Sequence, residues 1–137
     1  MRQVKIDASI ADMKPEPPRT LYAKLRRVLM AAHYSQCGFR SVYRTEAAFR
    51  DEVWLSVFSM VLAACFAPNV TIFLVVVAAH LIVFTAELLN SGMEAVVDLV
   101  SPDHHELAGQ AKDAGSAAVF CSLVLLAVAW IVLIIHL

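Results

Sequence analysis

Residues 70–89 read VTIFLVVVAAHLIVFTAELL, and residues 114–137 read AGSAAVFCSLVLLAVAWIVLIIHL. These two runs are almost wholly apolar, and only His80, Glu87 and His136 interrupt them with acidic or imidazole side chains. A helix needs about 20 mostly apolar residues to cross the hydrocarbon core of a bilayer, and both runs meet that length. The sequence therefore predicts two transmembrane helices.

A third apolar run, residues 53–67 (VWLSVFSMVLAACFA), is shorter but becomes long enough if its helix starts near Glu46. The Pro68-Asn69 pair would then form a tight turn into the next helix. Apolar residues make up 60% of the 137-residue chain, above the roughly 45–50% of soluble domains. We therefore predict a single all-α membrane domain over residues 20–137, with spans at about 47–67, 70–98 and 114–136.

The basic residues predict how these spans are oriented. Ten of the eleven lysines and arginines lie at or before Arg50, and the eleventh, Lys112, lies between the second and third spans. Because cytoplasmic segments of membrane proteins carry an excess of basic residues, we expect the N-terminal arm and the 98–113 loop to be cytoplasmic. The turn at Pro68 and the C-terminus then face outward, as three spans require.

The N-terminal region divides into an arm and a helix. Residues 1–19 mix charges with Pro15, Pro17 and Pro18, so we expect a disordered cytoplasmic arm. Thr20 can cap a helix over residues 20–35, in which apolar and basic side chains occupy different faces. Such a helix is typical of elements that lie in the membrane interface. Residues 38–44 are expected to turn the chain towards the first span.

Polar side chains on the second span give the strongest functional signal. At about 100° per residue, Glu87, Asn90, Glu94 and Asp98 fall within an arc of about 80° on one helix face. Ionisable groups at membrane depth cost about 2.5–3.5 kcal/mol each to insert, so they usually mark a functional site. A solvated helix extension would explain Asp98 and partly Glu94. It does not explain Glu87, which is surrounded by apolar residues.

Three further groups could contribute to chemistry. The sequence Asp-His-His-Glu at residues 103–106 suggests zinc, but consecutive ligands cannot share one helix face and no cysteine accompanies them. Lys112 is either a topology anchor or a cation for a phosphate-bearing ligand. Glu46 and Glu94 could together supply the two carboxylates that commonly hold Mg²⁺. We expect His80 to hydrogen-bond to a neighbouring helix, because polar side chains often join helices in membranes.

Soluble-kinase signatures are absent, since neither a GxxxxGK[ST] loop nor a protein-kinase catalytic loop occurs. The residues alone thus indicate a membrane protein with an acidic site and one lysine at the cytoplasmic interface. Three longer patterns add to this: EAAFR at residues 46–50, E-x-x-N-S-x-x-E-A-V-V-D at 87–98, and E-L-x-G-x-A-K-D-x-G-S-A-A-V at 106–119. From about Arg27 to its end, the chain resembles the prokaryotic diacylglycerol kinase family.

The resemblance implies a homotrimer of three-helix protomers with a surface helix, in the bacterial inner membrane. Its active sites would lie at the cytoplasmic interface between subunits, with ATP and diacylglycerol as substrates, Mg²⁺ as cofactor and no nucleic-acid partner. Glu87 would be the general base, and Glu46 and Glu94 would hold the metal. The resemblance also implies which residues form the nucleotide site. They are these two glutamates and Arg27, Tyr34, Asn90, Asp103, His104, His105, Lys112 and Asp113. The lipid site implied by the resemblance consists of Glu87 and Ala31, Arg40, Ala48, Arg50, Glu52 and Ser116.

Phosphoryl transfer suits such a site, because positioning and charge neutralisation dominate that reaction. Direct in-line transfer needs no covalent phosphoenzyme, and none is expected. A sister branch of the family phosphorylates undecaprenol, and the EAAFR and GSAAV forms look more like the diacylglycerol branch. Two other hypotheses remain. A small ion- or proton-conducting oligomer would leave Asn90, Lys112 and Asp113 unexplained, and a structural subunit would have no activity alone.

Overall fold

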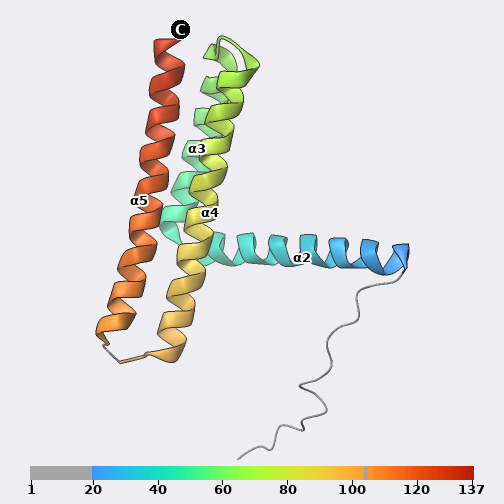
Figure 1. The fold of residues 1–137 in the computed structure, drawn as a ribbon, viewed down its shortest axis with the longest axis vertical. Helices are drawn as coiled ribbons and strands as arrows, with labels where there is room; N and C mark the ends of the chain where they lie inside the picture. The colour runs from blue at the N-terminus through green and yellow to red at the C-terminus, as the bar shows by residue number, and fades with distance from the viewer. Residues whose placement is uncertain (1–19, 104) are drawn as a thin grey trace, which may run out of the picture. The chain divides into compact units, whose positions relative to one another are not determined.

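The computed structural model of the chain describes residues 20–103 and 105–137 (Figure 1). Across these ranges it contains four α-helices and no β-strand, so the all-α prediction is confirmed. The chain divides into two compact units, Met1–Gln36 and Cys37–Leu137. The predicted disordered arm, residues 1–19, lies outside the described residues.

Helix α2 spans Leu21–Thr45 and begins as the sequence predicted. Thr20 caps its first turn, because the Thr20 hydroxyl oxygen accepts a hydrogen bond of 3.3 Å from the backbone N–H of Ala23. The predicted turn over residues 38–44 is wrong, since α2 continues to Thr45. A single glycine, Gly38, costs a helix only about 1 kcal/mol, and no proline accompanies it, so nothing in this stretch ends the helix.

The end of α2 is held by residues of the next helix, α3, which spans Ala47–Phe66. Arg50 donates hydrogen bonds from Nη1 to the backbone oxygens of Tyr43 and Arg44, at 3.3 and 3.2 Å. These carbonyls belong to the last turn of α2, where no helical N–H remains to bind them. The neighbouring Phe49 is fully buried and packs against Phe84 of the following helix, with ring centroids 5.7 Å apart.

Helices α3 and α4 are joined by the predicted tight turn, since α4 spans Val70–Val100. The side chain of Asn69 caps α4 by accepting a hydrogen bond of 3.0 Å from the N–H of Ile72. The last helix, α5, spans Glu106–Ile135 and therefore begins before the uncharged stretch of the predicted third span. Figure 1 shows α3, α4 and α5 side by side, with the C-terminus at the end that carries the α3–α4 turn.

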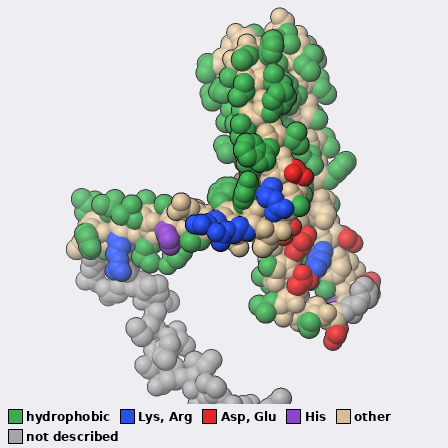
Figure 2. Space-filling model, turned by 180° about the vertical axis from the view of Figure 1, so that it is seen from behind, with side chains coloured by type: hydrophobic (Ala, Val, Ile, Leu, Met, Phe, Trp, Pro, Cys, Tyr) green, Lys and Arg blue, Asp and Glu red, His purple; other side chains and the backbone are tan. Residues whose placement is uncertain are grey.

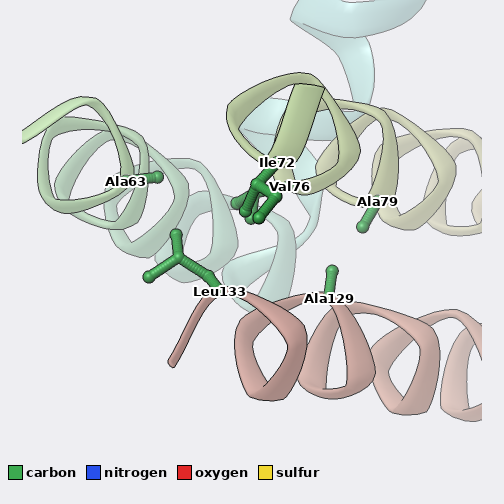
Figure 3. Close-up of a cluster of buried hydrophobic side chains, with 6 residues drawn as sticks. All are labelled: Ala63, Ile72, Val76, Ala79, Ala129 and Leu133. Carbon is green, nitrogen blue, oxygen red and sulfur yellow. The ribbon is translucent and has the colours of Figure 1, made fainter. Parts of the chain in front are cut away.

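The core of this bundle lies near that end and uses small side chains. Ala79 of α4 and Ala129 of α5 point towards each other, and Ala63 of α3 lies on the other side of the cluster, near Leu133 (Figure 3). Alanine allows helix backbones to approach closely, which is how helices commonly pack in membranes. The larger members of the cluster are Ile72, Val76 and Leu133. On α5, Trp130 also reaches α3 by donating a hydrogen bond of 2.9 Å from its indole N–H to Ser59.

Two helices, α4 and α5, are long and apolar enough to cross a membrane. Most of their apolar side chains are exposed in the protomer, and Figure 2 shows hydrophobic side chains covering one end of the bundle. The first turns of α3 carry Arg50, Asp51 and Glu52, and α3 does not meet the same criterion. The third span in α3 therefore stays a prediction.

His80 is buried in the middle of α4, but its described hydrogen bond is not the predicted one. Its ring Nδ1 lies 2.9 Å from the backbone oxygen of Val76, one turn earlier in the same helix. That carbonyl is already an acceptor within the helix and has a second lone pair for the imidazole. The expectation of a bond to a neighbouring helix was therefore wrong, because the residue's own helix supplied the partner.

Candidate active site

The acidic stripe predicted on the second span lies on α4 and varies in its exposure. Glu87 is 9% exposed, Asn90 and Glu94 are half-buried, and Asp98 is exposed. The amide of Asn90 donates a hydrogen bond of 2.9 Å from Nδ2 to Glu94 Oε1. Four residues separate these two positions, so one helical turn brings them together. The stripe therefore runs from a buried carboxyl group to a solvent-facing one.

Helix α3 adds two glutamates to this stripe. Glu46 precedes the helix with an extended backbone at φ −98° and ψ 116°, and its carboxylate makes no capping hydrogen bond. Glu46 and Glu94 both lie close enough to Glu87 for their charges to act on it. The sequence could not show whether Glu46 and Glu94 meet. In the structure the charges of both act on the same buried carboxyl group.

The second glutamate from α3, Glu52, touches Glu87 directly. The two carboxyl groups are in hydrogen-bond contact, and Glu52 Oε2 is buried with no partner among the described residues. An ionised carboxylate only accepts hydrogen bonds, so two carboxyl groups bond to each other only when one is protonated. Sequence reasoning named Glu52 only through the family resemblance and missed this contact, because no local spacing links residues on different helices.

Lys112 of α5 lies opposite the solvent end of the stripe. Its ammonium group forms an ion pair with Asp98 of α4 and also lies near the charge of Glu94. Asp113 and Ser116 follow on α5 and are both exposed. Figure 2 shows acidic side chains gathered around a basic one on this part of the bundle. Lys112 is therefore a cation beside the acidic cluster.

The connection between α4 and α5 forms a hollow of about 330 Å³ next to Lys112. Asp98, Asp103 and His105 line it, and His105 also caps α5 by accepting a 3.2 Å hydrogen bond from the N–H of Leu107 at Nδ1. The lining combines carboxylates, an imidazole and an ammonium group, and a phosphate-bearing ligand would meet a cation there. His104, also predicted at the nucleotide site, lies outside the described residues.

The remaining predicted residues belong to the two compact units of the chain. Arg27, Ala31 and Tyr34 belong to the first compact unit and are exposed there, so their roles stay predictions. Arg40 and Ala48 are exposed in the second unit. Arg50 binds the end of α2, as described above, which the sequence pattern did not indicate.

The donor atoms decide which metal the cluster suits. Among the described residues, no group of three or more histidine, cysteine, aspartate or glutamate side chains is arranged to hold a metal ion. A closed zinc site, which takes four such ligands, is therefore not formed by them. Mg²⁺ differs, because it is usually bound by one or two carboxylates together with water and substrate phosphates. Glu46 and Glu94 fit that smaller donor set.

Comparison with known proteins agrees with this chemistry. The model of the family described as "Prokaryotic diacylglycerol kinase" matches residues 33–134. The chain is 36% identical over 108 residues to the diacylglycerol kinase of Escherichia coli K12, covering 79% of this chain and 88% of the relative. It is 42% identical over 106 residues to that of Pseudomonas aeruginosa, covering 77% and 86%. The chain belongs to the prokaryotic diacylglycerol kinase family.

Proposed function

We propose that this protein transfers the γ-phosphate of ATP to the hydroxyl group of diacylglycerol, giving phosphatidic acid and ADP. Membership of the family and the printed names of the relatives support this activity and this acceptor. The observation that carries the proposal is the nearly buried Glu87, which has Glu46, Glu52 and Glu94 around it and lies on an apolar helix. A carboxyl group held at that depth can meet the hydroxyl of a lipid dissolved in the bilayer.

Glu87 acts as the general base in a direct in-line transfer. The proton of the lipid hydroxyl moves to the Glu87 carboxylate while the hydroxyl oxygen forms its bond to the γ-phosphorus. The bond from that phosphorus to the bridging oxygen breaks, and ADP carries away the electron pair. Phosphate passes straight to the lipid, so no phosphoenzyme forms. Glu52 hydrogen-bonds to Glu87 and holds its carboxylate in place.

Glu46 and Glu94 would hold Mg²⁺. When bound, the ion neutralises phosphate charge and orients the transferred group. Lys112 and Asp113 bind the nucleotide, and Asn90 positions Glu94 through the 2.9 Å hydrogen bond between them. The remaining nucleotide contacts proposed from the family are Arg27, Tyr34, Asp103, His104 and His105. Those proposed for the lipid are Ala31, Arg40, Ala48, Arg50, Glu52 and Ser116.

We place the protein in the bacterial inner membrane as a homotrimer of three-span protomers. Helices α4 and α5 supply two spans, and α3 supplies the third, starting at the headgroups where its charged first turns would remain hydrated. The N-terminal region and residues 98–113 are cytoplasmic, and the C-terminus is outside. The first part of α2 lies in the interface, which fits the exposure of Leu21, Leu25 and Leu29.

The decisive experiment measures transfer of labelled γ-phosphate in mixed micelles that contain diacylglycerol or undecaprenol. We expect phosphatidic acid from the wild-type protein and a loss of about 10²–10⁴-fold in Glu87→Gln, because a general base contributes about that much to the rate. Glu106→Gln is the matched control, since Glu106 is exposed at the start of α5, and it should retain activity. If undecaprenyl phosphate were the only labelled product, the choice of diacylglycerol as acceptor would be wrong. If Glu87→Gln kept its activity, the proposed role of Glu87 would be wrong.

A further inference from the structure

Gly115 of α5 lies against Asn90 of the acidic stripe on α4. It is buried, and a Cβ atom at this position would overlap Asn90 Oδ1 and lie 2.6 Å from Met93 Cε. The chain's other glycines, Gly38, Gly92 and Gly109, have no such atom within 4 Å of an added Cβ. A side chain is therefore excluded at one glycine of this protein, and the excluding group belongs to the candidate active site.

Two atoms crowd this position, and they differ in what their movement would cost. Met93 Cε is the end of a flexible side chain that can change rotamer cheaply. Asn90 is short, and its amide is already fixed at the other end, because Nδ2 donates to Glu94 Oε1 at 2.9 Å. Asn90 Oδ1 is buried without a hydrogen-bond partner among the described residues, so it is the hydrogen bond to Glu94 that sets the direction of the amide.

We propose that Gly115 is a positioning residue for the phosphoryl transfer, which acts by leaving room for the Asn90 amide that orients the Glu94 carboxylate. The inference rests on the proposed function, because it assigns Glu94 to the magnesium nucleotide. A methyl group at position 115 turns the Asn90 amide away and breaks its bond to Glu94. The fold absorbs this change, since one side-chain rotation relieves the overlap, while Glu94 loses the donor that fixes it.

The test compares Gly115→Ala with Gly92→Ala in the full-length protein reconstituted in micelles. Both changes add one methyl group to a helix, but Cβ meets open space only at position 92. We expect Gly115→Ala to weaken binding of Mn²⁺–ATP, measured by electron paramagnetic resonance, by about tenfold or more, with the mutant still helical and of wild-type size. Gly92→Ala should stay within about twofold of the wild type.

A double mutant separates positioning from general helix packing. In an Asn90→Ala background there is no amide to displace, so adding Gly115→Ala should change Mn²⁺–ATP affinity by less than about twofold. An additional loss as large as in the wild type would show that Gly115 acts by spacing the helices, and would overturn the proposal.

A readout that needs no nucleotide keeps this inference separate from the proposed function. The side-chain amide resonance of Asn90, assigned by its loss in Asn90→Ala, should shift in Gly115→Ala and stay unchanged in Gly92→Ala. An unshifted resonance in Gly115→Ala overturns the positioning role, whatever the wild-type activity. Failure of the wild-type protein to transfer phosphate, with the resonance shifted, overturns the proposed function while the control of Asn90 by Gly115 stands.

Discussion

Glu52 of α3 and Glu87 of α4 hold their carboxyl groups in hydrogen-bond contact across the interface between the two helices. Glu87 is 9% exposed and Glu52 is half-buried, so the contact is partly shielded from solvent. Two carboxyl groups bond to each other only when one of them carries a proton. The contact joins the charged first turns of α3 to the buried end of the acidic stripe.

This contact predicts that two substitutions of Glu52 will differ in how much kinase activity they remove. Glu52→Gln keeps a donor, because an amide N–H can bond to the Glu87 carboxylate, so kinase activity should stay within about fivefold of the wild type. Glu52→Leu removes the donor and should lower kcat by about tenfold or more, since a lost hydrogen bond to a charged group costs about 1.5–3 kcal/mol. Steady-state kinetics with diacylglycerol would measure both. Equal losses in the two variants would show that the carboxyl group itself, and not hydrogen bonding, is needed.

The sequence predicted the elements of this fold better than their contacts. Apolar runs predicted α4 and α5, Pro68-Asn69 predicted the turn, and Thr20 predicted the start of α2, because each signal is local. The end of α2 was missed, since what holds it at Thr45 is the guanidinium of Arg50, which belongs to the next helix. Local composition cannot report a partner that comes from another element.

In the candidate site too, local sequence predicted some features, while contacts between helices could not be predicted. Periodicity placed Glu87, Asn90 and Glu94 on one face, and the 2.9 Å bond between Asn90 and Glu94 follows from their spacing of one turn. The contact between Glu52 and Glu87 depends on how α3 packs on α4, and the role of Gly115 depends on how closely α5 approaches. Those distances arise from packing, which no single stretch of sequence encodes.

Lys112 gives a prediction about the nucleotide. Its ion pair with Asp98 is exposed to solvent, so breaking the pair should change stability little. Lys112→Met should nevertheless raise the KM for Mg-ATP by about tenfold or more, because it removes the cation proposed to meet phosphate. Asp98→Asn is the control: it breaks the same ion pair but keeps the ammonium group. Kinetics and thermal unfolding of both variants would test this, and a matching loss of activity in Asp98→Asn would contradict the assignment.

The small side chains between α4 and α5 give a prediction about stability. Ala79 and Ala129 are both buried and face each other, so Ala79→Leu adds volume between α4 and α5 (Figure 3). We expect about 1–3 kcal/mol of destabilisation, the usual cost of overpacking a core. Ala127→Leu makes the same change at an exposed position of α5 and should cost much less. Unfolding in mixed micelles, followed by circular dichroism, would compare them. Equal stability of the two variants would mean that α4 and α5 are not packed closely at Ala79.

Arg50 gives a prediction that links the end of α2 to Glu46. Its two hydrogen bonds, to the carbonyls of Tyr43 and Arg44, hold the last turn of α2 just before Glu46. Arg50→Gln should weaken that turn by about 1 kcal/mol, because the hydrogen bonds are exposed and their net contribution is modest. Amide hydrogen exchange in peptides covering residues 43–46 should then be about fivefold faster. Asp51→Asn, next to Arg50 in α3, should leave exchange there unchanged. Since Glu46 is proposed to hold Mg²⁺, the Arg50 variant should also need a higher Mg²⁺ concentration for half-maximal activity. Unchanged exchange together with an unchanged Mg²⁺ requirement would show that the carbonyl contacts of Arg50 do not hold this turn.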